Sequence, residues 1–288
     1  MTVAPKVLRR AEWAWPTQPV HLEVIARDVP DSDSPPLLFL HGLGHAAWCY
    51  AEHWQEAAAA RGYSSYALSY RGHGGSGGQN DLRRATLRDY VHDVLQVITT
   101  LPQPPVVIAH SLGTLVAQRL LQRYPARAGV LMTPIPAGGI PGTVVQGMRR
   151  KPVDFTKAVL GATLRFSADD LFSDLPPEVA RGYVSRIGRE SPWAQYAMLR
   201  PERLGPLLCP VLVVGAEDDR LVAAADVERC ARALGTQPLW VPGGHDVMLD
   251  GSWPDVLDTI LDWVDATCPP GPPLSGAREL PPLEVTFE

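Results

Sequence analysis

Residues 106–121 read VVIAHSLGTLVAQRLL and join three local patterns in one short segment. The run Val106–Ala109 is apolar and rich in β-branched residues, as a buried strand is. After Gly113 the apolar positions recur at the 3.6-residue period of a helix. Ser111 falls at the turn between them, in a small-x-Ser-x-Gly pattern that exposes the serine beside a helix N-terminus. This context predicts that Ser111 is a nucleophile.

A second glycine-containing turn follows another apolar strand, in the stretch FLHGLG at residues 39–44. A carbonyl attacked by serine develops a negative charge on its oxygen, which needs two backbone N–H donors. Glycines allow a loop to approach the nucleophile closely enough to supply one of them. We expect the backbone N–H groups of Leu43 and Leu112 to form this oxyanion hole.

Two later strand ends carry an acid and a histidine. Residues 211–222 read VLVVGAEDDRLV, and residues 241–246 read VPGGHD. A histidine can take the proton of an attacking serine, and a carboxylate can orient that histidine. We therefore predict His245 as the base, with Asp218 or Asp219 as the acid. The chain order is serine, acid, histidine.

Outward from these motifs, short apolar runs alternate with segments of helical period. Thr86 precedes one helical segment that ends near Ile98, and Ser252 precedes another that ends near Val264. This alternation predicts an α/β fold with a mostly parallel central sheet and helices on both faces. The expected strands lie at residues 37–40, 66–68, 106–109, 130–132, 211–214 and 238–241, with an edge or hairpin strand at 21–26.

The chain resembles the α/β-hydrolase superfamily, in particular its lysophospholipase-like or thioesterase-like branch. The resemblance rests on HGLGHAAWCYAEHW, ALSYRGHGGSGG, VVIAHSLGTLVAQRLL, VLVVGAEDDRLV and PGGHDVMLDGSW. It covers nearly the whole core, from about residue 37 to residue 265. It implies an α/β-hydrolase fold and a serine hydrolase that needs no cofactor and no metal.

Two departures from the family pattern and one ambiguity concern the predicted site. Ala109 stands where the first glycine of the turn is usual, and Thr114 stands where relatives often carry another glycine. A Gly-x-x-Asp pattern would select Asp218 as the acid, whereas a GAE-x-D-x-apolar pattern would select Asp219. Asp219 directly precedes Arg-Leu-Val, and this register favours Asp219.

The stretch from residue 134 to residue 206 contains short helical pieces between Gly and Pro and no convincing core strand. We interpret it as a helical cap inserted into a core made of residues 1–133 and 207–267. Its apolar side chains are expected partly to line a substrate pocket and partly to pack on the core. Residues 268–288 form a Pro-rich tail.

Composition excludes several function classes. The net charge is −5 and the isoelectric point about 5.9, so no broad cationic field attracts nucleic acid. No apolar run is long enough for an integral membrane segment or a signal peptide. The four cysteines form no CxxC pair, which argues against a zinc site and a disulfide framework and suits a cytoplasmic location.

These observations predict an enzyme that cleaves an ester or thioester of a hydrophobic acyl group through an acyl-enzyme. The alternatives are a lyase, cyclase or acyltransferase on the same fold, or a non-catalytic ligand receptor. A lipase acting at a membrane surface would need an exposed apolar face on the cap. His110 is expected to point away from the pocket and to pack. Arg71 and His73 are expected to anchor loops near the site rather than to react.

Overall fold

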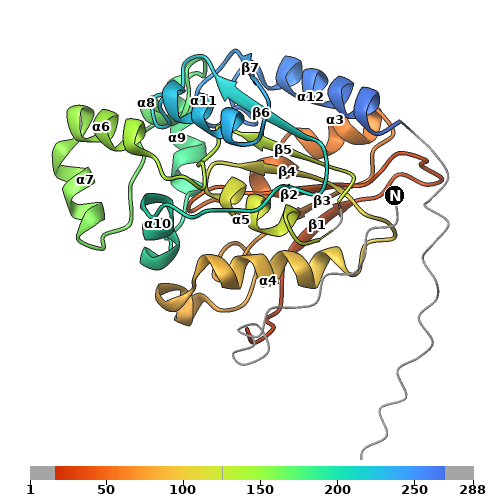
Figure 1. Ribbon diagram of the computed structural model, residues 1–288, viewed down its shortest axis with the longest axis horizontal. Helices are drawn as coiled ribbons and strands as arrows, with labels where there is room; N and C mark the ends of the chain where they lie inside the picture. The colour runs from red at the N-terminus through yellow and green to blue at the C-terminus, as the bar shows by residue number, and fades with distance from the viewer. Residues whose placement is uncertain (1–16, 125, 270–288) are drawn as a thin grey trace, which may run out of the picture.

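The computed structural model describes residues 17–124 and 126–269, and it contains a seven-stranded sheet in the order β1-β3-β2-β4-β5-β6-β7. Strand β1 pairs antiparallel with β3, and the other neighbours run parallel. Figure 1 shows the sheet passing through the middle of the molecule. The strands are β1 (Val24–Arg27), β2 (Leu37–Leu40), β3 (Ser65–Leu68), β4 (Val106–His110), β5 (Ala128–Met132), β6 (Val211–Ala216) and β7 (Pro238–Val241).

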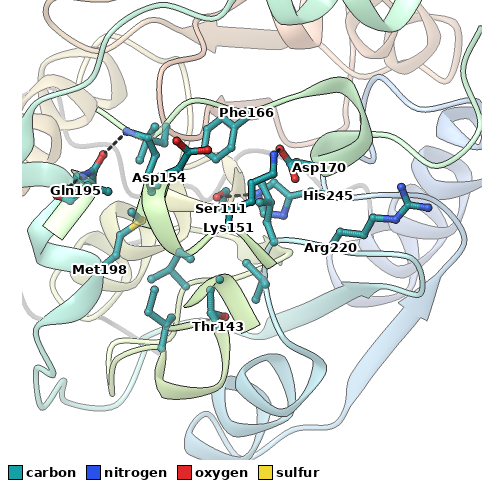
Figure 2. A pocket seen from close by; sticks show the side chains of 18 of the residues that line it. Ser111, Thr143, Lys151, Asp154, Phe166, Asp170, Gln195, Met198, Arg220 and His245 are labelled. Atoms are coloured by element: carbon teal, nitrogen blue, oxygen red, sulfur yellow. Dashed lines mark hydrogen bonds and ion pairs between the residues drawn. The ribbon is translucent and has the colours of Figure 1, made fainter. Parts of the chain in front are cut away.

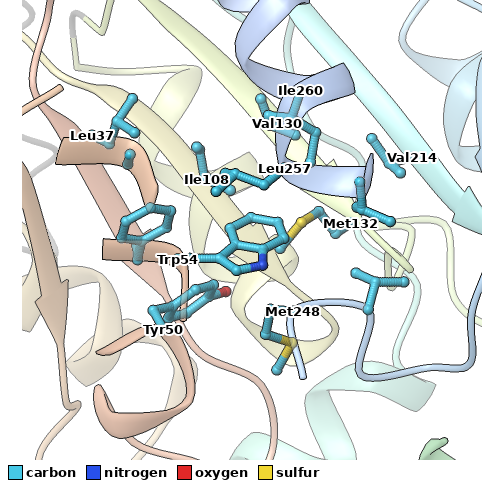
Figure 3. Packing of buried hydrophobic residues seen from close by; sticks show 14 of the residues in the cluster. Leu37, Tyr50, Trp54, Ile108, Val130, Met132, Val214, Met248, Leu257 and Ile260 are labelled. Carbon is cyan, nitrogen blue, oxygen red and sulfur yellow. The ribbon is translucent and has the colours of Figure 1, made fainter. Parts of the chain in front are cut away.

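The central strands are buried on both faces, which explains why they read as continuous apolar runs rather than alternating ones. Every residue of β2 is fully buried. One apolar cluster joins the sheet to α3 (Trp54–Ala60) and α12 (Trp253–Thr267), with Trp54 among its largest side chains (Figure 3). The other cluster joins the sheet to α4 (Leu87–Ile98), α5 (Leu112–Leu121) and α11 (Ala224–Ala233). Helices therefore cover both faces, as predicted.

Most predicted elements form within a few residues of their expected bounds. Helix α4 begins after Thr86, whose side chain accepts from the Asp89 backbone N–H while Asp89 accepts from the Thr86 backbone, a capping box. Three elements were not predicted, namely α2 (Trp48–Ala51), α3 and the 3-10 helix Gln79–Arg84. The alanine run that ends α3 has high helix propensity, but the surrounding tryptophans and histidines hide a clear helical period.

Between β5 and β6 the chain forms only helices among the described residues. They are α6 (Pro141–Arg150), α7 (Pro152–Val159), α8 (Ala168–Leu171), α9 (Pro177–Arg186) and α10 (Pro192–Leu199). Helices α6 and α7 project from the body at the left of Figure 1. The sheet continues directly from β5 to β6 through parallel pairing, which is what an insertion between two core strands leaves intact.

The carboxyl ends of the parallel strands meet at one edge of the sheet. Ligands of open α/β sheets bind outside this edge. Apart from Cys268 and Pro269, the Pro-rich tail lies outside the described residues. Within those residues, none of the helices combines the length and the apolar character that crossing a bilayer requires.

Candidate active site

Ser111 occupies a sharp turn between β4 and α5. Its backbone has φ 50° and ψ −120°, a conformation that costs energy for any residue with a side chain and that occurs mostly at functional sites. Close approach explains Gly113, because a Cβ there would lie 2.6 Å from the His41 carbonyl oxygen and 2.8 Å from that of Leu40. Ala109, by contrast, is fully buried within β4, so the turn forms with alanine in place of the first glycine.

His245 lies on the loop after β7, and its two ring nitrogens face the other two predicted residues. Nε2 is 3.0 Å from Ser111 Oγ (Figure 2). Nδ1 is 2.9 Å from Asp219 Oδ2. The loop reaches this position because Gly243 adopts φ 114°, which favours glycine, and because Gly244 passes close to the Leu171 carbonyl. Two consecutive hydrogen bonds thus link Ser111, His245 and Asp219.

The structure brings Asp219 rather than Asp218 to His245. The other Asp219 oxygen, Oδ1, accepts the backbone N–H groups of Leu221 and Val222 at 2.8 and 2.9 Å. These two bonds fix the carboxylate plane, so that Oδ2 is aimed at the imidazole. Asp218 is exposed beside it. The segment Arg-Leu-Val that favoured Asp219 in the sequence therefore supplies its anchoring amides.

Electrostatics at His245 combine two opposed effects. Burial would lower the pKa of the imidazole, since it disfavours the charged ring. The Asp219 carboxylate, with smaller contributions from Asp246 and Asp170, outweighs burial, and the pKa of His245 lies above its ordinary value of 6.5. The site therefore stabilises an imidazolium, which is the species formed when this histidine takes a proton.

Leu112 directly follows Ser111 in the chain, and Leu43 lines the same pocket as Ser111. Neither backbone N–H group has an acceptor among the residues that the structure describes. Leu112 opens α5, whose N-terminus carries a partial positive charge. The Leu43 loop approaches through Gly42, where a Cβ would lie 2.7 Å from His110 Nδ1 and 3.1 Å from Ser111 Cβ. The two amides are thus available to an oxyanion.

Thr114, the second departure from the family pattern, ties the nucleophile turn to the segment after β5. Its hydroxyl donates to the Ser111 carbonyl at 2.6 Å and accepts the Ile135 backbone N–H at 2.9 Å. The side chain is fully buried. A glycine could make neither bond. Thr114 therefore links the Ser111 turn to Ile135 by hydrogen bonds that the usual glycine lacks.

His110 does more than pack. It is buried and does not line the pocket, but its Nε2 donates to the His245 carbonyl at 3.0 Å. Burial lowers the pKa of His110 to about 3, so the ring is neutral and supports the backbone of the neighbouring histidine.

Arg71 and His73 both make buried contacts near the site. The Arg71 guanidinium pairs with the fully buried Asp93, with Nη2 2.6 Å from Oδ1. His73 Nε2 lies 3.4 Å from Glu190 Oε2, and its Nδ1 donates to the Arg71 carbonyl. Neither side chain contacts Ser111 or His245 in the described structure.

A pocket opens over Ser111 and His245, between the strand ends and the helices that follow β5. Its lining is mostly apolar, and Figure 2 shows Met198 and Phe166 beside the serine. The apolar side chains are Leu43, Ile135, Ile140, Leu164, Phe166, Met198, Leu199, Leu221 and Val222, and charged residues including Arg150, Lys151, Asp154 and Arg220 complete the lining. Such a cavity suits a hydrophobic group next to a reactive serine.

Several polar residues near the site have no sequence motif. Asp250 accepts the Gly244 N–H at 2.6 Å and the Ser173 N–H and hydroxyl at 2.8 Å each. Asp246 pairs with His45, and Glu190 pairs with His73. Asp246 follows His245 directly, whereas nothing in the sequence around Glu190 distinguishes it.

One group among the described residues has metal-like spacing: His110, His245 and Asp246 bring one potential ligand atom each within 4.8 Å of one another. Four of the six ring-nitrogen and carboxylate-oxygen atoms of this group are engaged, whereas His110 Nδ1 and Asp246 Oδ1 have no hydrogen-bond partner among the described residues. His110 donates to a carbonyl, Asp246 accepts from His45, and His245 contacts Ser111 and Asp219. The arrangement fits a hydrogen-bond network better than a metal site.

Comparison with known proteins supplies independent information. The model of the alpha/beta hydrolase family matches residues 37–259. The monoacylglycerol lipase of Mycolicibacterium smegmatis is 27% identical over 271 residues, which cover 82% of this chain and 90% of the relative.

Two solved structures share the architecture. A thermophilic esterase from Thermogutta terrifontis superposes with a TM-score of 0.64 and 20% identity, covering 86% of this chain and 94% of the other. The monoacylglycerol lipase of Paleococcus ferrophilus has a TM-score of 0.64 and 17% identity, covering 87% of this chain and all (100%) of the other. The predicted fold class is therefore confirmed.

Proposed function

The chain belongs to the α/β-hydrolase family, and from this we propose that it hydrolyses an ester or thioester of a hydrophobic acyl group. Ser111 is the nucleophile, His245 the base and Asp219 the acid that orients it. The observation that carries the proposal is the relay from Ser111 Oγ to His245 Nε2, at 3.0 Å, and from His245 Nδ1 to Asp219, at 2.9 Å. A relay of this geometry is what acyl transfer by serine requires.

In the first step, Ser111 Oγ attacks the acyl carbonyl while His245 Nε2 takes the hydroxyl proton. The carbonyl oxygen becomes an oxyanion, which accepts from the Leu43 and Leu112 N–H groups. Asp219 stabilises the imidazolium formed at His245. When the tetrahedral intermediate collapses, the bond to the leaving alcohol or thiol breaks, and His245 returns the proton to it.

In the second step, water attacks the acyl-serine. His245 Nε2 takes a proton from the water, and the same two amides hold the new oxyanion. Collapse breaks the ester bond to Ser111 Oγ, which regains its proton from His245. The products are a carboxylic acid and the free enzyme, and the chemistry needs no cofactor.

The substrate class follows from the pocket. Its mostly apolar lining suits an acyl chain. The names of the relatives, a monoacylglycerol lipase and an esterase, support an ester. We also propose that residues 134–206 act as a cap over a core of residues 1–133 and 207–267. The cytoplasmic location stays a prediction.

Helices α6 and α7 and the residue after α7 carry exposed apolar side chains, which a surface-acting lipase needs. Val153 is 63% exposed on α7, and Leu160 just after it is 81% exposed. Val145 and Met148 on α6 are 49% and 43% exposed, and basic residues adjoin them, namely Arg149, Arg150 and Lys157. Exposed apolar and basic side chains on one projecting unit favour contact with an anionic lipid surface. We expect Leu160→Asp to reduce co-sedimentation with anionic vesicles while leaving turnover of a water-soluble ester unchanged.

Active-site labelling tests the catalytic proposal. Wild type, Ser111→Ala and Ser185→Ala are treated with a fluorophosphonate probe, and each is assayed on esters of increasing chain length. Ser185 is exposed and bonds only to the Gly182 carbonyl, so it is a matched control. We expect labelling and turnover in wild type and Ser185→Ala and neither in Ser111→Ala. If folded Ser111→Ala is still labelled, or if none of the three proteins is labelled, Ser111 is not the nucleophile. Labelling without ester turnover would favour a lyase, cyclase or acyltransferase.

A further inference from the structure

Glu190 is a buried acid from the cap that lies against the oxyanion loop. It sits between α9 and α10, and the residue is only 3% exposed. Its Oε2 accepts the Gly44 backbone N–H at 3.2 Å. Its Oε1 accepts the Tyr90 hydroxyl at 2.5 Å and the Ser191 backbone N–H at 2.7 Å. A buried carboxylate is costly unless it is paired and hydrogen-bonded, and these donors together with His73 meet that need.

The peptide unit that joins Leu43 to Gly44 is held at both of its polar ends. Its N–H donates to Glu190, and its carbonyl oxygen lies 3.0 Å from His45 Nδ1. The other His45 nitrogen, Nε2, is 2.9 Å from Asp246 Oδ2. His45 thus bridges the Leu43 carbonyl and the Asp246 carboxylate. The orientation of this peptide therefore depends on two buried side chains on opposite sides.

The cap also contacts the same loop through its backbone. The Gly188 N–H donates to the Gly44 carbonyl at 2.7 Å. A Cβ at Gly44 would lie 2.9 Å from the Gly188 carbonyl oxygen, so the two segments touch. Residues 188–190 thus hydrogen-bond to the turn directly after Leu43. The Leu43 N–H is the proposed oxyanion donor.

We propose that Glu190 is a positioning residue that holds the oxyanion loop in its working geometry and so couples the cap to catalysis. This inference rests on the proposed function. Glu190 touches no reacting atom, and it acts by fixing the Gly44 N–H, which in turn sets where the preceding Leu43 N–H points. A donor is useful only where the oxyanion forms, so a small rotation of this loop weakens transition-state binding more than substrate binding.

Glu190→Gln removes this function with little change of shape. A glutamine offers one oxygen and one NH2 group in place of two oxygens. With the NH2 at the Oε2 position it faces the Gly44 N–H, and at the Oε1 position it faces the Ser191 N–H. In both orientations two donors oppose each other. The matched control is Glu202→Gln, because Glu202 follows α10 and pairs with Arg119, and neither of these two residues lines the pocket.

The experiment compares wild type, Glu190→Gln and Glu202→Gln, with active sites counted by fluorophosphonate titration. The measured quantities are kcat and KM for one ester, and Kd for a trifluoromethyl ketone and for the matching alcohol. Ser111 Oγ adds to the carbonyl of the ketone, and the adduct carries an oxyanion. The alcohol forms no such adduct. For Glu190→Gln we expect kcat and ketone affinity to fall together by about 10- to 100-fold. KM and alcohol affinity should stay within about threefold of wild type, since they report ground-state binding. Glu202→Gln should match wild type.

An unchanged kcat in Glu190→Gln would overturn the proposal, and so would a rise in KM alone, which would indicate substrate contact or cap packing. If Glu190→Gln yields no titratable sites, Glu190→Asp is measured instead. That variant keeps the charge on a shorter side chain and should show a smaller loss of the same kind. Wild type that is neither labelled nor active would refute the proposed function instead of this inference.

Discussion

Asp219→Asn should inactivate the enzyme by forcing the wrong tautomer on His245. Asp219 Oδ1 accepts two backbone N–H groups, from Leu221 and Val222. In the variant only the amide oxygen can occupy that position, because an NH2 group there would face two donors. The NH2 group must then point at His245 Nδ1, which has to accept. The proton moves to Nε2, and Nε2 can no longer take the proton of Ser111.

The expected loss is large because the local backbone leaves the asparagine no second orientation. Enforcing the wrong tautomer in a serine triad costs about 10⁴-fold in kcat, which corresponds to about 5 kcal/mol of barrier. Asp218→Asn is the matched control, since Asp218 is the exposed neighbour. It should keep wild-type activity. Both variants are assayed for kcat on one ester, with fluorophosphonate labelling rates as a second readout.

The pH profile gives the same test a direction. His245 works as a base when it is neutral, so activity rises as pH passes through its pKa. Because Asp219 raises that pKa above the ordinary value, the rising limb of wild type lies above pH 6.5. Residual activity of Asp219→Asn should rise at lower pH than in wild type. Activity of Asp219→Asn within tenfold of wild type would refute the tautomer argument, and so would equal losses in Asp218→Asn.

Three further expectations follow from particular contacts. Gly113→Ala should lower the free energy of unfolding by about 1–3 kcal/mol in urea titrations, because its Cβ meets two backbone oxygens. The control is Gly182→Ala, in α9, where nothing lies within 4 Å of the new Cβ. This variant should raise the free energy of unfolding by about 0.5–1 kcal/mol. Thr114→Val removes both hydroxyl bonds and orphans a buried N–H, so we expect a loss of about 1–3 kcal/mol in the same titration; an unchanged value would contradict this. Met198→Trp narrows the pocket beside Ser111, and kcat/KM for long acyl chains should fall about tenfold relative to short ones; an unchanged chain-length preference would mean that acyl chains bind elsewhere.

The strands and the nucleophile turn could be predicted from sequence because their causes are local. A run such as Val106–Ala109 is apolar throughout since both faces of the sheet are covered. Gly113 is needed because its turn passes close to the backbone oxygens of Leu40 and His41. Gly42 is needed because a Cβ there would meet the side chains of His110 and Ser111. The cap helices were also partly predictable, because proline opens α9 and α10 in the first turn.

Choosing between neighbouring residues needed the fold. Asp218 and Asp219 have the same chemistry. The register before Arg-Leu-Val favoured Asp219, and the fold shows that its carboxylate lies against His245. His110 was expected to pack, yet it donates to a carbonyl from a segment 135 positions later in the chain. Such contacts depend on how the loops after β4 and β7 meet at the strand ends.

Glu190 marks the boundary between local and tertiary information. Residues 187–193 read IGRESPW, and no pattern there separates a solvated glutamate from a buried one. Glu190 is buried because the segment between α9 and α10 returns to Gly44, at a separation of 146 residues. Local sequence therefore dictates which segments become strands, turns and helices, since backbone preference and apolar period act over a few residues. The buried charges around the site are set by packing between distant segments, because a carboxylate is stable there only when the complete fold supplies its donors.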